Sequence, residues 1–156
     1  MRRIFLFMVL CGICVGGYAT AQASDPTDLE TIPFETVFQG WYANGIVERT
    51  ALVVNDTGAY RSVWEMITHG VSPTPPAPPV DFETTTVIFI SCGVMPSGGY
   101  EVEIERIVAV DDGLEVEVVI SEPPEDTAVT MALTQPYHGV ALNKTALPVR
   151  FEWETR

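Results

Sequence analysis

The sequence predicts a mainly β domain, at the margin of the α+β class: an antiparallel β-sandwich or open barrel of about seven or eight strands with one packed helix. Three observations favour this class. Apolar and polar residues alternate over several segments, most regularly over 147–154. Gly, Pro, Asn and Asp residues separate these segments at short intervals. One segment, 60–67, carries apolar residues at helical spacing instead.

The first two β segments are predicted to form a hairpin, 34–43 with 46–54. The dipeptide Asn44-Gly45 separates them, and it is favoured in type I′ turns because both central residues need a positive φ. This turn would place Tyr42 opposite Val47 and collect the apolar side chains of both strands on one face.

One helix follows. Residues 55–57 offer capping side chains, and 69–70 is a His-Gly pair suited to the helix end. Between them, one face carries Tyr60, Val63, Trp64 and Ile67, which we interpret as core packing. Segment 71–80 contains five prolines and is predicted to be an extended surface connector, with docking to an aromatic groove as the alternative.

The middle of the chain is predicted to form the central strands of the β structure. Residues 87–90 are continuously apolar, as in a strand covered on both faces. A loop over 93–99 leads into a strand over 100–110, and a three-residue turn ending in Gly113 is expected to pair Val108 with Val116. That register puts Arg106 on the apolar face, so we expect a β-bulge or a carboxylate partner there.

The opposite face of this hairpin is rich in glutamate. Such a face could bind Ca²⁺ through its carboxylates, but an ordinary solvated strand face is the favoured interpretation. Further strands are expected over 129–134, over 140–142 after an interruption at 135–138, and over 147–153.

The N-terminus predicts secretion. Residues 1–23 combine two arginines, an apolar run and an Ala-Gln-Ala site, as in a cleavable signal peptide. We expect a tether over 24–33, a single domain over 34–156, and a secreted or periplasmic product that meets the membrane only through its signal segment. Only Cys92 would remain after cleavage, so no internal disulfide is expected.

The charge excludes some partners. A formal net charge of −13 argues against binding nucleic acid or anionic lipid, because both need clusters of Lys and Arg. No catalytic residue, metal site or cofactor is predicted. Ser97 lacks the Gly-x-Ser-x-Gly context, and with only two histidines in the chain we interpret His69 as a helix cap and His138 as an ordinary loop residue.

Four stretches resemble the PrcB-like protease-complex subunits of bacteria: 96–104, which reads PSGGYEVEI, 134–138, which reads TQPYH, 63–64 at the helix, and 80–82 before an apolar strand. The resemblance spans most of 34–153. It implies a non-catalytic secreted protein that binds and stabilises a partner protein, in particular a secreted protease. One alternative is a structural envelope protein without a protease partner.

The same two loops are similar to parts of the chagasin-type inhibitors of cysteine proteases, which insert loops into the enzyme cleft. Met95, Gly98 and Gln135 depart from that pattern. Loop-mediated inhibition is therefore the second hypothesis. Under either one, the candidate partner-binding residues are Pro96, Ser97, Gly98, Gly99, Tyr100, Gln135, Pro136 and Tyr137. Because side chains alternate between the two faces of a strand, a register that directs Val102 into the core also directs Tyr100 into the core.

Overall fold

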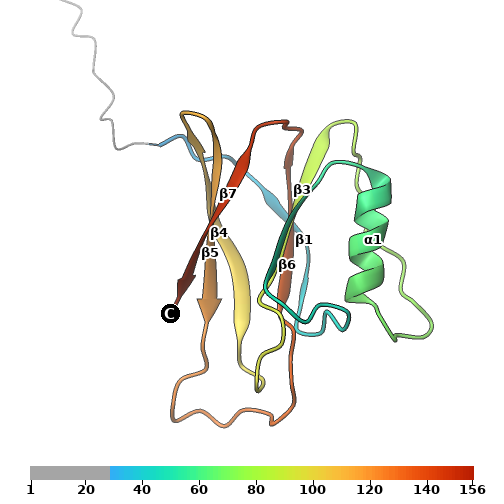
Figure 1. Ribbon diagram of the computed structural model, residues 1–156, viewed down its shortest axis with the longest axis vertical. Coiled ribbons are helices and arrows are strands. Elements are labelled where there is room, and N and C mark those ends of the chain that lie inside the picture. The colour runs from blue at the N-terminus through green and yellow to red at the C-terminus, as the bar shows by residue number, and fades with distance from the viewer. Residues whose placement is uncertain (1–28) are drawn as a thin grey trace, which may run out of the picture.

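A computed structural model describes residues 29–156, so the predicted signal peptide lies outside the described residues. Figure 1 shows a β-sandwich with one helix against its outer side. The elements in order are β1 (Glu35–Gly40), β2 (Thr50–Val54), α1 (Thr57–Ile67), β3 (Thr85–Ser91), β4 (Glu101–Val110), β5 (Gly113–Ser121), β6 (Tyr137–Asn143) and β7 (Val149–Thr155). The α1 helix is too short and too polar to cross a membrane, and it is the one helix of the described part.

The strands form two sheets. A four-stranded sheet has the order β1-β6-β3-β2, and a three-stranded sheet has the order β4-β5-β7. Neither sheet closes into a barrel within residues 29–156, so the sandwich form of the predicted fold is confirmed. All pairings are antiparallel except that of β5 with β7, which is parallel. The expectation of a wholly antiparallel structure was therefore wrong at this one edge.

Strand β3 is covered on both faces, as its continuous apolar run predicts. Ile88 and Ile90 face the core between the two sheets, whereas Val87 and Phe89 face α1. All four side chains are completely buried. The molecule therefore has three layers, with the four-stranded sheet in the middle (Figure 1).

The helix forms as its sequence predicts. The Asp56 carboxylate accepts a hydrogen bond from the Ala59 amide at 2.9 Å, which is an N-cap. Tyr60, Val63 and Ile67 are buried against the sheet. The proline-rich connector returns along the helix, where Trp64 Nε1 donates to the Pro75 carbonyl at 2.8 Å and the Tyr60 hydroxyl donates to the Pro78 carbonyl at 3.0 Å.

The predicted hairpin between 34–43 and 46–54 is wrong. β1 pairs with β6 and β2 pairs with β3, so these strands lie at opposite edges of one sheet. The Asn44 and Gly45 amides instead donate to the Ile67 and Met66 carbonyls at 3.2 and 2.9 Å. The dipeptide thus donates to carbonyls at the end of α1, and Gly45 has no positive φ.

The β4–β5 hairpin forms, but its predicted register is wrong. Val110 pairs with Gly113 across a two-residue turn, and Ile107 rather than Val108 pairs with Val116. The expected bulge is present between Ile104 and Arg106. It turns Arg106 to the solvent face, where the guanidinium binds the Glu117 carboxylate at 2.6 Å.

Residues 129–134 form no strand, which corrects that prediction. Met131 and Leu133 are 91% and 62% exposed. Alternation alone was misleading here, because a strand also needs a neighbouring strand to satisfy its backbone groups. β6 begins later, at Tyr137, so the predicted interruption at 135–138 is in part a strand.

The last residues of the predicted tether are part of the fold. The Ile32 amide donates to the Ile107 carbonyl, and the Ala109 amide donates to the Glu30 carbonyl, both at 2.8 Å. Ile32 also packs against the core between the sheets. Residues 30–32 therefore cover part of the edge of β4.

Candidate functional site

The predicted loop 93–99 and the loop 122–136, which includes the segment wrongly predicted as a strand, lie together at one end of the sandwich, the lower end in Figure 1. Met95 and Thr134 exchange backbone hydrogen bonds at 2.7 and 3.2 Å. The Gly98 amide donates to the Thr130 carbonyl at 2.9 Å, and the Thr134 hydroxyl donates to the Ser97 carbonyl at 2.8 Å. Segments 37 residues apart in the chain thus form one unit.

The two glycines of the first loop permit this close approach. A Cβ on Gly98 would collide with the Thr130 hydroxyl. Gly99 has a φ of +85°, and a Cβ there would lie 2.8 Å from the Pro123 side chain. Gly98 and Gly99 therefore serve to dock one loop on the other.

A third loop, 41–49, joins them, which sequence reasoning missed. The Gln135 amide donates to the Trp41 carbonyl at 2.8 Å, and the Val94 amide donates to the Val47 carbonyl at 3.1 Å. The signal that could have found it is the Trp41-Tyr42 pair between Gly40 and Asn44-Gly45, since aromatic residues in a turn-rich loop have no strand face to bury them.

These three loops carry six of the ten large apolar side chains that are exposed in the described residues. We call this surface the loop face, and it consists of Trp41, Tyr42, Val47, Val94, Met131 and Leu133. Trp41 and Tyr42 are 54% and 55% exposed, and Val47 is 69% exposed. Side chains of this kind gain most from being covered by another molecule.

The predicted partner-binding residues lie at this same end but differ in accessibility. Pro96 and Gly99 are exposed, whereas Gly98 and Pro136 are buried. The others, Ser97, Tyr100, Gln135 and Tyr137, are half-buried. The Tyr137 ring packs on Phe38 and Phe89, with ring centroids 6.2 and 6.4 Å away, and burial raises the pKa of its hydroxyl.

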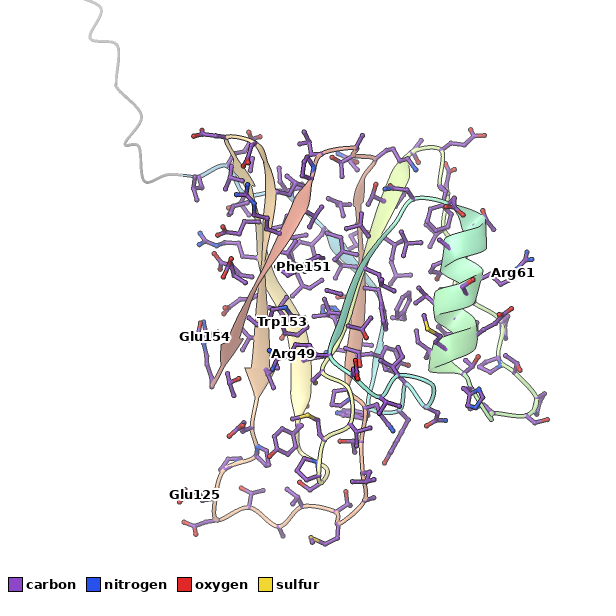
Figure 2. All side chains as sticks on the ribbon, in the orientation of Figure 1. Arg49, Arg61, Glu125, Phe151, Trp153 and Glu154 are labelled. Carbon is purple, nitrogen blue, oxygen red and sulfur yellow. The ribbon has the colours of Figure 1, made fainter. Side chains whose placement is uncertain are left out.

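Acidic residues border the loop face. Glu48, Glu122, Glu125 and Asp126 are exposed in the three loops, and Figure 2 shows Glu125 at the far tip of the longest one. Beside Trp41, a pocket of about 360 Å³ lies between β1 and β4 and includes Glu101 and Glu103 in its wall. An apolar centre with an acidic border suits a protein surface with apolar and basic residues.

His138 is a buried core residue, which corrects its interpretation as a loop histidine. It is the second residue of β6 and is 1% exposed. Its Nδ1 accepts a hydrogen bond from the Ile104 amide at 3.0 Å, and its Nε2 lies 2.9 Å from the Thr36 hydroxyl. Since a backbone N–H can only donate, Nδ1 carries no proton, and burial lowers the pKa of the ring to about 4.

Other chemically interesting side chains have structural surroundings. Burial raises the pKa of the Cys92 thiol to about 11. The Ser97 hydroxyl donates to the neighbouring Gly98 carbonyl at 3.0 Å. Within residues 29–156, no group of three or more His, Cys, Asp or Glu side chains is arranged to hold a metal ion.

The side of the sandwich between β2 and β7 is closed by a cation–π contact. The Arg49 guanidinium lies 4.9 Å from the centre of the Trp153 ring, and Figure 2 shows the two side chains together between the sheets. This contact connects the loop before β2 to the last strand, near the end that carries the loop face.

The described residues thus define a mainly β sandwich domain in which three hydrogen-bonded loops at one end carry exposed apolar side chains. Residues 86–143 match the family model described as PrcB C-terminal. The predicted resemblance to PrcB-like proteins is confirmed for this segment, which runs from β3 to β6 and includes two of the three loops but not 41–49. The comparisons show no similarity to chagasin-type inhibitors, and neither curated proteins nor solved structures match the chain.

Proposed function

We propose that this chain is a non-catalytic secreted accessory protein that binds and stabilises a partner protein, a secreted protease, through its loop face. The observation that carries the proposal is the set of six exposed apolar side chains gathered from three loops. The match of residues 86–143 to the PrcB C-terminal family, whose resemblance implies a protease-complex subunit, supports the partner class. The predicted signal peptide supports secretion.

The rigidity of the loop face favours binding. Its loops are held by backbone hydrogen bonds from Val94, Met95, Gly98 and Gln135, so little conformational entropy would be lost on association. Trp41 and Tyr42 are the residue types that most often anchor protein interfaces. The acidic border would favour a partner with basic residues around its own apolar patch.

Inhibition by insertion into a protease cleft has less support. Pro136 and Gly98, which that hypothesis would place at loop tips, are buried, and Tyr137 packs in the aromatic core. The exposed apolar residues lie at other positions of these two loops and in the third loop, 41–49.

The test is affinity capture of a protease from the native secreted fraction with residues 24–156. The Met131→Asp/Leu133→Asp double variant removes two anchors of the loop face. The matched control is Leu147→Asp, since Leu147 is 54% exposed and lies in the β6–β7 loop at the opposite end. Because one interface anchor contributes about 2 kcal/mol, we expect the double variant to bind at least about 30-fold more weakly and the control to bind normally.

The captured protease is then incubated at elevated temperature with and without the chain. A longer half-life of activity would support stabilisation, and loss of activity on mixing would support inhibition instead. Equal binding by the double variant, the control and the unmodified chain would refute the role of the loop face.

A further inference from the structure

His138 joins three of the six strands that border the loop face, one from each loop. It lies at the start of β6, immediately after loop 122–136, and bonds to Ile104 near the start of β4, after loop 93–99. Its other nitrogen bonds to Thr36 of β1, the strand that leads into loop 41–49. Thr36 is the second residue of β1 and Ile104 is the fourth residue of β4, so one imidazole connects the two sheets through three strands, each of which carries one of the loops at an end.

Irregularities in both neighbouring strands surround this ring. In β1 the pairing with β6 shifts between Thr36 and Phe38, and in β4 the pairing with β5 shifts between Ile104 and Arg106. Bulges bend strands and redirect backbone groups. Here they accompany the approach of Thr36 and Ile104 to the same side chain from opposite sheets.

We propose that His138 is a proton-sensitive cross-link between the two sheets: the neutral ring holds the start of β4 against β6, and protonation releases it and loosens the loop face. The reason is that the imidazole ring offers different hydrogen-bond donors and acceptors in its neutral and protonated forms. A neutral imidazole offers one acceptor and one donor, which suit the Ile104 amide and the Thr36 hydroxyl. An imidazolium has two donors, so its Nδ1–H would face the Ile104 N–H and that bond would be lost.

The surroundings of His138 provide no opposite charge to hold the imidazolium in place. In the described chain, β3 has no charged residue, and β1 contributes only Glu35, which is exposed. On β4, the side chains of Glu101, Glu103, Glu105 and Arg106 are all exposed, and Arg106 binds Glu117. The buried Cys92 and the half-buried Tyr137 nearby have raised pKa values and are uncharged at neutral and mildly acidic pH.

The pH range over which the cross-link weakens follows from the direction in which the His138 pKa is shifted. The pKa of His138 is lowered from 6.5 to about 4 by burial, so the opened form binds a proton more readily than the closed form. The cross-link is therefore fully stable above pH 6.5 and weakens as the pH falls from 6.5 toward 4. Thr36, which is exposed on the edge strand, lies between the ring and solvent.

The experiment measures hydrogen exchange of the Ile104 amide in the free protein, residues 24–156, at pH 7 and pH 5, corrected for the intrinsic exchange rate. We expect its protection to fall on the order of 20-fold at pH 5, from linkage between the two pKa values. The His138→Gln variant keeps one acceptor and one donor but does not titrate, so its protection should not change. The control His69→Gln replaces the exposed histidine of the described chain and should behave like the unmodified protein.

Equal protection at the two pH values in the unmodified protein, or the same loss in His138→Gln, would overturn the proposal. If His138→Gln does not fold, the pKa of His138 is measured in the unmodified protein by NMR titration of the two histidine ring resonances. The His69→Gln variant identifies which resonance belongs to His138. A His138 pKa at or above 6.5 would then overturn it. Because the loop face is the proposed partner-binding surface, its loosening should also weaken partner binding at pH 5. That expectation rests on the proposed function, whereas the exchange experiment needs no partner, so the two can fail separately.

Discussion

At the scale of single residues, Gly139 and Phe38 show how a missing side chain creates a packing site. The two residues are paired across β6 and β1, and the Phe38 ring lies where a Cβ of Gly139 would be. Phe38 is the centre of an aromatic cluster on the helix side of the sheet, in contact with Tyr60, Trp64 and Phe89. The absence of one carbon atom at position 139 therefore supports the packing of α1 on the sheet.

We expect Gly139→Ala to destabilise the protein by about 1–3 kcal/mol, the usual cost of overpacking a core. The ring would have to move relative to the four aromatic side chains around it, those of Tyr60, Trp64, Phe89 and Tyr137. Urea unfolding followed by tryptophan fluorescence measures the change. In a Phe38→Leu background, where the ring is absent, the same substitution should cost much less. An equal cost in both backgrounds would show that the ring is not what Gly139 accommodates.

At the scale of elements, the bulge in β4 explains why the strand changes its facing pattern. Val102 and Ile104 face the core, and Ile107 faces it again after an interval of three residues. Glu105 is the extra residue that makes this possible, and both it and Arg106 are exposed. The bulge thus keeps a charged side chain out of the core without breaking the hairpin.

Deletion of Glu105 should therefore be better tolerated than deletion of Glu103. Without Glu105 the strand alternates regularly, and Ile104 and Ile107 keep their pairing with Val118 and Val116. Without Glu103, Val102 would face solvent, which costs about 2 kcal/mol for a buried side chain of this size. Urea unfolding of the two deletion variants tests the difference, and a less stable Glu105 deletion would contradict it.

At the scale of the whole molecule, the fold is a helix, a four-stranded sheet and a three-stranded sheet in three layers, held by two apolar cores. The two open edges of the sandwich are each covered by contacts of a few residues. The Arg49 and Trp153 side chains close one side, and residues 30–32 cover part of the other. The folded unit therefore includes residues before 34.

A chain of residues 29–156 should be more stable than one of 34–156. The shorter chain loses two backbone hydrogen bonds to β4 and the partial burial of Ile32, together roughly 2–3 kcal/mol. Thermal and urea unfolding of both chains measure this difference. An Ile32→Ala variant of the longer chain separates the side-chain contribution from that of the hydrogen bonds. Equal stability of the two chains would place the start of the domain at residue 34.

The sequence by itself determined the features that depend on near neighbours. It predicted a cap within residues 55–57, the buried face of α1, the two-sided burial of β3, and either a bulge or a carboxylate partner at Arg106. Part of the candidate site was also predictable, since proline and glycine mark loop 93–99 and the region of residues 135–137. In each case the pattern of a few consecutive residues reports which side of an element is buried.

Only the tertiary structure decided which segments meet. Asn44-Gly45 has the composition of a hairpin turn but caps α1, because the carbonyls of Met66 and Ile67 are brought to it by packing. The parallel pairing of β5 with β7, the loop face and the position of His138 likewise depend on residues far apart in the chain. Periodicity indicates that a face is covered, but not what covers it, because strand pairing and packing are non-local interactions.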